Sequence, residues 1–151
     1  MSSSKPFSLD EFKDIYSKVP RLCVEVIVKT PEGVVLSLRK LPSWYGKWHI
    51  PGGTVFYKEK VADAVKRVAG EELGIKISSQ ELLGYIEYPS EGKEVGFGTS
   101  VGLAFLCSAE AASMKPNNDA SEIKIFKSLP DNMIDEQYNF LKAKWEYINK
   151  D

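Results

Sequence analysis

The sequence has little that marks a secreted or membrane-spanning protein. Cysteine is scarce: Cys23 and Cys107 are the only two, and each stands inside an apolar run, where a free cysteine behaves as a small buried hydrophobe. No window approaches the roughly 20 apolar residues that cross a membrane, and the start of the chain lacks the apolar stretch of a signal peptide. We therefore expect two core cysteines, a reducing cytoplasmic setting and no membrane partner.

An excess of either charge is also absent. The chain has 20 basic and 21 acidic side chains, and no run of five like charges occurs. Nothing in this balance recommends a nucleic-acid polymer as a partner. What the chain does have is 151 residues, of which 43% are hydrophobic, and this is enough to build a substantial core. Its size predicts a single domain over residues 1–151.

Apolar residues follow helical spacing in some segments and strand-like runs in others. Ser8 and Glu11 have the spacing of a capping box, and apolar residues then recur at helical intervals until Pro20, which predicts a short amphipathic helix. A proline and a glycine at 30–33 separate two β-branched runs and predict a hairpin. We expect strands at 22–29, 34–39, 48–50, 82–88, 99–107 and 123–126, and longer helices at about 60–73 and 134–148. This order predicts an α/β fold in which helices cover a mixed sheet.

The most informative segment joins a glycine pair to an acidic helix. Gly52 and Gly53 follow the strand at 48–50 and precede the helix at about 60–73, and glycine lets the backbone approach a ligand closely. Near the end of that helix stand Glu71 and Glu72, whose like charges repel unless a cation lies between them. Mg²⁺ prefers a few hard oxygen ligands together with waters and phosphates. The segment therefore predicts a divalent metal site.

A projection of this helix at about 100° per residue divides it into two arcs. The arc assigned to the core holds Ala62, Val65, Ala69 and Leu73. The arc assigned to the site holds Ala64, Arg67, Val68, Glu71 and Glu72. On this assignment Val68 lies beside the two carboxylates.

The same residues resemble the signature of the Nudix hydrolases. That signature is a glycine, five residues, a glutamate, seven residues, an arginine and, further on, Glu-Glu-x-Gly with an aliphatic residue. It is matched here by Gly53, Glu59, Arg67, Glu71, Glu72, Gly74 and Ile75. The resemblance implies a Nudix-type α/β/α sandwich, a nucleoside diphosphate substrate and a homodimer. It also implies Mg²⁺ or Mn²⁺ on Glu71, Glu72 and the Gly52 carbonyl, and an ion pair between Arg67 and Glu59 that orients the loop.

One position departs from that signature. The residue after Arg67, usually a glutamate in the family, is Val68, which neither binds a cation nor accepts a proton. GDP-mannose mannosyl hydrolases also lack this glutamate and attack the sugar carbon instead of phosphorus. The first half of the chain, including the approach at 39–53, resembles that subgroup. Its proposed loop histidine is not matched in residues 116–122, and Thr54 stands where the subgroup has an arginine.

Several other side chains are candidates for binding and proton transfer. Asp119 and Glu122 lie in the loop that approaches the metal in relatives, so each carboxylate is a candidate general base. Arg39 and Lys40 are candidates for binding a diphosphate, together with Gly53 of the signature.

The only histidine and three aromatic residues could serve either the site or the structure of the core. His49, the only histidine, alternates with its neighbours on a strand, which favours a structural role. Trp44, Tyr45 and Phe97 stand in segments with glycine or proline, where they would stack on a base or sugar or else pack in the core.

The sequence leaves three functions open. The first is Mg²⁺-dependent hydrolysis of a nucleotide sugar such as GDP-mannose at the sugar carbon, with catalytic roles for Arg67, Glu71 and Glu72 and a loop carboxylate that activates water. The second is cleavage of a pyrophosphate bond, as in ADP-ribose. The third is a nucleotide-binding module without activity, which Val68 favours and the retained charged residues disfavour.

Overall fold

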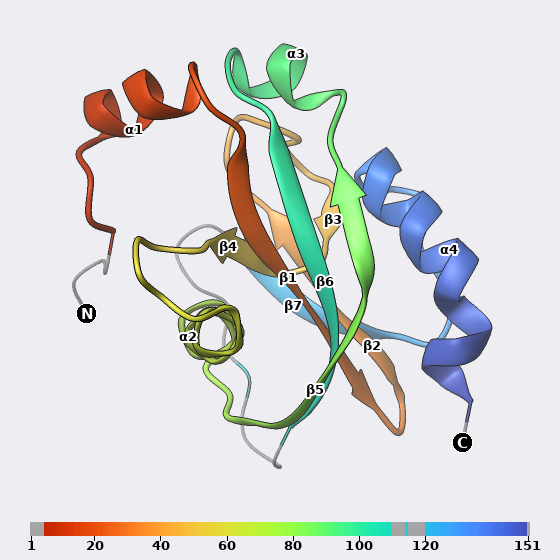
Figure 1. Ribbon diagram of the computed structural model, residues 1–151. Helices are drawn as coiled ribbons and strands as arrows, with labels where there is room; N and C mark the ends of the chain where they lie inside the picture. Colours follow the sequence, from red (N-terminus) through yellow and green to blue (C-terminus); the bar gives the residue numbers. More distant parts are fainter. Residues whose placement is uncertain (1–4, 110–113, 115–119, 151) are drawn as a thin grey trace.

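In the computed structural model, which describes residues 5–109, 114 and 120–150, a seven-stranded mixed sheet has a helix on each face (Figure 1). The strands are β1 (Arg21–Thr30), β2 (Gly33–Arg39), β3 (Trp48–His49), β4 (Gly52–Thr54), β5 (Ile77–Glu87), β6 (Ser100–Ala109) and β7 (Ala120–Phe126). The helices are α1 (Leu9–Tyr16), α2 (Val61–Leu73), α3 (Glu91–Val95) and α4 (Asp135–Asn149). The α/β/α sandwich is confirmed.

Strand β1 connects the two halves of the sheet. It pairs parallel with β6 on one side and antiparallel with the short β4 on the other. Its end turns into β2 through a tight hairpin, with Thr30 opposite Gly33, as predicted. β2 then pairs with β3 and β7, while β5 pairs with β6. Gly52 and Gly53 therefore lie in strand β4, whereas the sequence places them in a loop after the strand at 48–50.

The two faces of the sheet carry separate apolar cores because successive strand residues point in opposite directions. Val24, Val26 and Val28 of β1 pack with the apolar side of α2. Ile27 packs on the opposite face, in the cluster that contains Leu141 of α4. Helices α1 and α3 lie together at one end of the sheet, near the start of β1 (Figure 1).

Local signals in the sequence identify the helix ends well. Ser8 and Glu11 form both hydrogen bonds of the predicted capping box at the start of α1. Gly74 ends α2 with a φ of 66°, a left-handed conformation that glycine adopts without a Cβ penalty. The five-residue α3 is not predicted, because a single turn is too short to show a helical period.

Strand β5 is longer than predicted, beginning at Ile77 and not at Leu82. It lies at the edge of the path β3-β2-β1-β6-β5 and pairs with β6 alone. Ser78 and Ser79 are exposed there, so the apolar pattern that would indicate a strand is missing.

Buried cysteine and histidine side chains behave as predicted. Cys23 and Cys107 are free and buried. His49 is buried, its Nδ1 lies 2.9 Å from the Ile50 carbonyl oxygen, and burial followed by the charge of Arg39 lowers its pKa to about 3. These contacts fit a structural role for a neutral His49. No helix in the described part of the chain is long and apolar enough to cross a membrane.

Glu25 is a buried carboxylate on the α4 side of β1. A Cβ atom on Gly52 would lie 2.3 Å from Glu25 Oε1, and one on Gly102 would lie 2.5 Å from Oε2. Both distances are far below van der Waals contact. The glycines on the two strands that flank β1 therefore leave the space in which this carboxylate lies.

A chain of hydrogen bonds joins Glu25 to α4. The Tyr88 hydroxyl donates to Glu25 Oε2. Gln137 Nε2 donates to the Tyr88 hydroxyl at 2.9 Å, and the Ile50 backbone N–H donates to Gln137 Oε1 at 2.7 Å. Such a network is stable in the interior only when its members are paired.

Glu25 makes the stability of the protein depend on pH. Burial raises its pKa to about 7, although the hydrogen bond from Tyr88 and the charge of Arg21 act in the opposite direction. Because the ordinary value is 4.5, this contribution to stability is full below pH 4.5 and is lost as the pH rises through 7. We expect wild type to lose on the order of 3 kcal/mol relative to Glu25→Gln between pH 4 and pH 8.

Urea unfolding of both proteins at several pH values measures this difference. Glu87→Gln, which changes an exposed carboxylate of β5, is the matched control and should follow wild type. A constant difference between wild type and Glu25→Gln from pH 4 to pH 8 would contradict a raised pKa at Glu25.

Candidate active site

The guanidinium group of Arg67, in the middle of α2, is the centre of a charged network between this helix and the loop that precedes it. Its Nε donates to Glu59 Oε2 at 2.8 Å and its Nη2 donates to Glu59 Oε1 at 3.0 Å, so the pair is bidentate. Nη1 donates to Glu71 Oε1 at 2.9 Å, and Nη2 also donates to the Thr54 carbonyl at 2.7 Å. Arg67 thereby joins β4, the following loop and α2. This is the ion pair that the resemblance to the Nudix signature implies.

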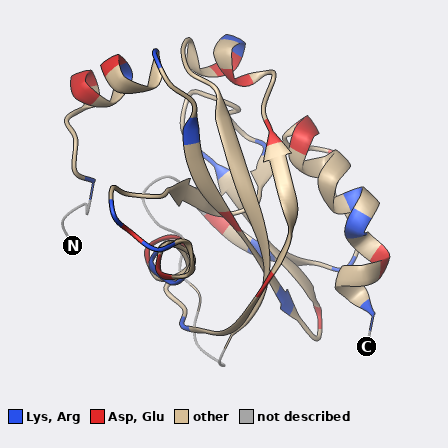
Figure 2. Ribbon diagram, viewed as in Figure 1, with Lys and Arg blue, Asp and Glu red and all other residues tan. Residues whose placement is uncertain are grey.

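The hydrogen bonds of this network favour the charged forms of Glu59 and Arg67. Hydrogen bonds from Arg67 lower the pKa of Glu59, with a further contribution from the Phe56 N–H, although partial burial opposes them. Burial acts to lower the pKa of Arg67, but Glu59 and Glu71 together raise it. The guanidinium carbon also lies 3.8 Å from the centre of the Phe56 ring. Figure 2 shows charged residues of both signs along the segment from β4 into α2.

The packing on one face of β4 requires glycine at position 52, and the packing on the other face is tight at Gly53. A Cβ atom on Gly52 would collide with Glu25, and one on Gly53 would lie 3.0 Å from Val68 Cγ2. The sequence analysis assigns these glycines to close approach of a ligand. The structure adds a second reason, because side chains of the protein itself occupy the space on either side.

The division of α2 into two arcs is wrong in part. Val68 is only 1% exposed and belongs to the core. The buried residues of α2 are Ala64, Val65, Val68, Ala69 and Leu73, whereas Ala62 is exposed. The buried arc is wider than the sequence indicates because α2 packs against β1, β4 and β5 together. The side chain of Val68 therefore packs in the core under Gly53.

The two predicted carboxylate ligands, Glu71 and Glu72, are half-buried near the end of α2. Among the described residues, no three His, Cys, Asp or Glu side chains are grouped so as to hold a metal ion. The two carboxylates and the Gly52 carbonyl would supply hard oxygen ligands and would leave the other positions to water and phosphate. Mg²⁺ is bound in this way at phosphate sites, so the residues fit a divalent ion shared with a diphosphate.

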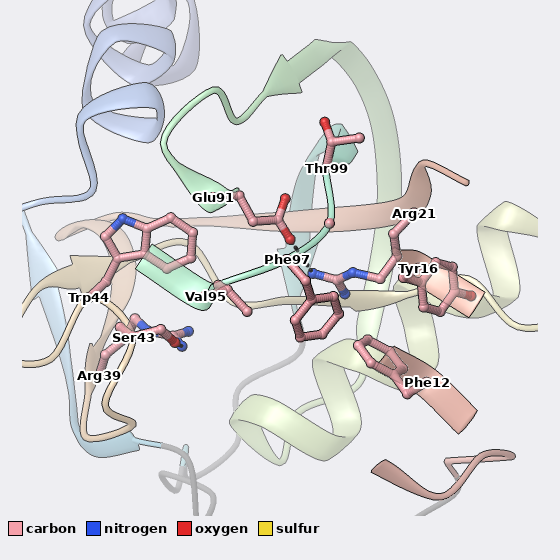
Figure 3. Close-up of a pocket in the computed structure, with 11 residues that line it drawn as sticks. Phe12, Tyr16, Arg21, Arg39, Ser43, Trp44, Glu91, Val95, Phe97 and Thr99 are labelled. Carbon is pink, nitrogen blue, oxygen red and sulfur yellow. Dashed lines mark hydrogen bonds and ion pairs between the residues drawn. The ribbon is translucent and has the colours of Figure 1, made fainter. Parts of the chain in front are cut away.

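A cavity of about 190 Å³ lies at the end of the sheet between α1 and α3 (Figure 3). Of the three predicted binding residues, Arg39 lines it, whereas Lys40 and Gly53 do not. Of the three aromatic residues with two alternatives, Trp44 and Phe97 line it and Tyr45 is exposed outside it. Arg39 Nε donates to the Ser43 carbonyl at 2.8 Å, and its guanidinium carbon lies 5.6 Å from the centre of the Trp44 ring.

The two candidate bases are placed differently. Glu122 is exposed on β7, opposite Leu38 of β2. Ile123 and Ile125 of the same strand pack on the α2 side of the sheet. Because side chains alternate along a strand, Glu122 lies on the opposite face. Glu122 is therefore directed away from α2. Asp119 lies outside the described residues.

Arg21 and Glu91 are site residues that the sequence does not reveal. Arg21 Nη1 donates to Thr54 Oγ1 at 2.8 Å, and its Nη2 lies 3.5 Å from Glu91 Oε2. The Ser100 hydroxyl donates to the same Glu91 oxygen at 2.8 Å. These residues are 70 positions apart in the chain, and no local pattern connects them. Glu25, in contrast, has a signal, because it is the only charged residue in the apolar run 22–28.

Comparisons with known proteins agree with this geometry. The NUDIX domain family matches residues 19–145. The low-salt glycan biosynthesis protein Agl8 of Haloferax volcanii is 31% identical over 121 residues, which are 78% of each chain. An ADP-ribose pyrophosphatase of Methanocaldococcus jannaschii is 27% identical over 139 residues, covering 82% of this chain and 80% of that protein.

Solved structures have the same fold. A crystal structure of a MutT Nudix hydrolase from Burkholderia pseudomallei matches with a TM-score of 0.73 at 23% identity, over 82% of this chain and 97% of that one. The matched signature, the Arg67 network and these similarities together show that the chain belongs to the Nudix family and is a Nudix hydrolase.

The burial of Val68 changes what a glutamate at this position would do. Val68→Glu places a carboxylate in the core under Gly53, so we expect a loss of about 3 kcal/mol or more in stability together with a fall in activity. Thermal unfolding and turnover of the variant measure the two effects. Lys66→Glu, which adds the same side chain on the exposed face of α2, is the control and should change stability little. Unchanged stability with raised activity would show instead that position 68 faces the metal.

Proposed function

We propose that this Nudix hydrolase cleaves a nucleotide sugar at the sugar carbon and releases a nucleoside diphosphate. The observation that carries the proposal is the burial of Val68 in the core, at the position where the family usually has a glutamate. With Val68 there, α2 offers Glu71 and Glu72 without the usual third carboxylate. This set suits stabilisation of negative charge on a departing diphosphate better than activation of water on the helix.

The proposed ion is Mg²⁺, held by Glu71, Glu72 and the Gly52 carbonyl, and when bound it would neutralise charge on the leaving diphosphate. Arg67 holds Glu71 in place through the hydrogen bond from Nη1. Arg39 and Lys40 follow one another at the end of β2, where their cations would bind the same diphosphate. Glu122 is directed away from α2, so Asp119 is the proposed acceptor of the proton from water.

Cleavage of a pyrophosphate bond is the second candidate, and the similarity to an ADP-ribose pyrophosphatase favours it. The relative in Haloferax is described as a glycan biosynthesis protein, which supports a nucleotide sugar, since glycans are assembled from activated sugars. The Arg67 network argues against a binding module without activity, because nucleotide binding alone does not require a charged metal site. The homodimer and the cytoplasmic setting stay predictions.

Removal of one carboxylate charge should weaken the metal site without disturbing the fold. We expect Glu72→Gln to lower turnover by a factor of about 100 or more. Glu71→Gln should act in the same direction and more weakly. The measurement is initial rate against Mg²⁺ concentration, with GDP-mannose and ADP-ribose as substrates. Asp63→Asn, an exposed carboxylate of the same helix, is the control. Near wild-type rates for both glutamine variants at limiting Mg²⁺ would eliminate the proposed metal site.

Isotope-labelled water identifies the bond that is cleaved. Hydrolysis of a nucleotide sugar in water enriched in oxygen-18 should place the label in the sugar product, because we propose attack at carbon. Mass spectrometry of the two products measures it. Label in a product phosphate would show attack at phosphorus and would favour the pyrophosphatase alternative.

A further inference from the structure

Aromatic side chains from three distant segments surround the cavity at the end of the sheet. Phe12 and Tyr16 come from α1, Trp44 from the segment between β2 and β3, and Phe97 from the segment between α3 and β6. The ring centres of Phe12 and Tyr16 are 4.7 Å apart, and Phe97 meets Phe12 edge-on at 6.2 Å. Figure 3 shows Trp44 on one side of the cavity and the α1 residues on the other. A planar ring in this space would meet aromatic residues on two sides, together with the Arg21 and Arg39 guanidinium carbons that lie 5.6 Å from the ring centres of Phe12 and Trp44.

Glu91 lines this cavity with a carboxylate of which only one oxygen is paired within the described part of the chain. The residue is 5% exposed, and its Oε2 accepts the hydrogen bond from Ser100 and lies beside Arg21. Its other oxygen, Oε1, is buried and has no hydrogen-bond partner among the described residues. Figure 3 shows one carboxylate oxygen directed toward Arg21 and the other directed to the side of the cavity on which Thr99 lies. An unpaired buried carboxylate oxygen costs free energy, which a donor on a ligand would recover.

The size and polarity of the cavity decide which part of a substrate fits it. Its volume of about 190 Å³ is several times the roughly 30 Å³ of one water and below the roughly 300 Å³ at which pockets for whole ligands begin. It would therefore hold one ring system. Arg21 and Arg39 donate to Thr54 and Ser43, which holds their guanidinium groups beside the rings of Phe12 and Trp44. A nucleobase has two apolar faces that fit beside such rings, whereas the faces of a sugar carry hydroxyl groups that would be buried there.

Thr54 connects the cavity to the proposed metal site. Its hydroxyl accepts a hydrogen bond from Arg21, which lines the cavity, and its carbonyl accepts one from Arg67. Arg67 in turn holds Glu71. A ligand with its ring in the cavity would therefore have its remaining part close to β4.

We propose that the cavity binds the nucleobase of the substrate and that Glu91 Oε1 accepts a hydrogen bond from an N–H group of that base. The proposal rests on the proposed function, because it concerns the nucleotide end of the same substrate. Glu91 is then a specificity-determining residue, and Trp44 is one of the two aromatic walls.

Tryptophan fluorescence and calorimetry test the proposal with ADP, GDP, CDP and UDP in the presence of Mg²⁺. Pyrophosphate, which has no base, is the reference ligand. We expect at least one nucleotide to quench the fluorescence of Trp44 while pyrophosphate does not, and we expect Trp44→Phe to abolish the quenching. Quenching by mannose 1-phosphate and by none of the nucleotides would assign the cavity to the sugar and overturn the proposal.

Glu91→Gln separates recognition of the base from binding of the phosphates. It should raise the Kd of the best nucleotide about tenfold or more and change the Kd of pyrophosphate less than twofold. Glu136→Gln is the matched control, because Glu136 also has a buried oxygen without a partner among the described residues but lies outside the cavity. An equal loss for nucleotide and pyrophosphate would show that Glu91 only positions Arg21, and this would overturn the proposal.

An analogue without the N–H donor tests the hydrogen bond itself. The analogue is N6,N6-dimethyl-ADP if ADP binds best and 1,N2,N2-trimethyl-GDP if GDP binds best. It is N4,N4-dimethyl-CDP or 3-methyl-UDP if a pyrimidine nucleotide binds best. It should bind wild type as weakly as the parent nucleotide binds Glu91→Gln, and the variant should bind both ligands equally. If the analogue and Glu91→Gln each weaken binding and their effects add when combined, the proposed hydrogen bond is rejected. If Glu91→Gln does not fold by circular dichroism, Phe97→Leu tests the aromatic wall, and an unchanged nucleotide Kd in that variant would reject the pocket.

These outcomes are separate from those of the proposed function. Hydrolysis of a nucleotide sugar with no quenching of Trp44 would reject the base pocket and leave the proposed function intact. Quenching of Trp44 by a nucleotide, with no hydrolysis of any nucleotide derivative, would reject the proposed function and leave the pocket intact.

Discussion

The bidentate pair between Arg67 and Glu59 holds the loop after β4 against α2. Three elements meet at this guanidinium group, because it also donates to Glu71 and to the Thr54 carbonyl. A lysine could not replace it, since one ammonium group does not present the planar fork that these contacts require. The proposed metal ligands come from both sides of the loop, Gly52 before it and Glu71 after it. Their relative position therefore depends on this one side chain.

The interior of the sheet imposes a second constraint on the same segment. Gly52 lies against Glu25 on one face of β4, and Gly53 lies against Val68 on the other. The backbone of β4 is thus fixed between a buried carboxylate and a core valine. Because Glu25 is also joined through Tyr88 to Gln137 of α4, the two helix layers both reach the strand that carries the site.

The sequence predicts the fold class and the Arg67 network well, because both depend on local patterns. The capping box at Ser8, the left-handed Gly74 and the spacing of the Nudix signature are each contained in a short window. Predictions failed where packing between distant segments decides the outcome. The face of α2 that holds Val68 depends on how many strands cover the helix, and no periodicity within the helix reports that number. The pairing of Arg21 with Glu91 likewise exists only after β1 and α3 have come together.

The cavity at the end of the sheet is built almost entirely outside the Nudix signature, which spans residues 53–75. Its walls come from α1, from the segment between β2 and β3, and from α3 with the residues that follow it. Substitutions in these three segments can reshape the space for a ligand without changing a residue of the Arg67 network. The architecture therefore lets the shape of this cavity diverge between related proteins while the Arg67 network stays constant. In such a molecule the signature and the end of the sheet can change independently of each other.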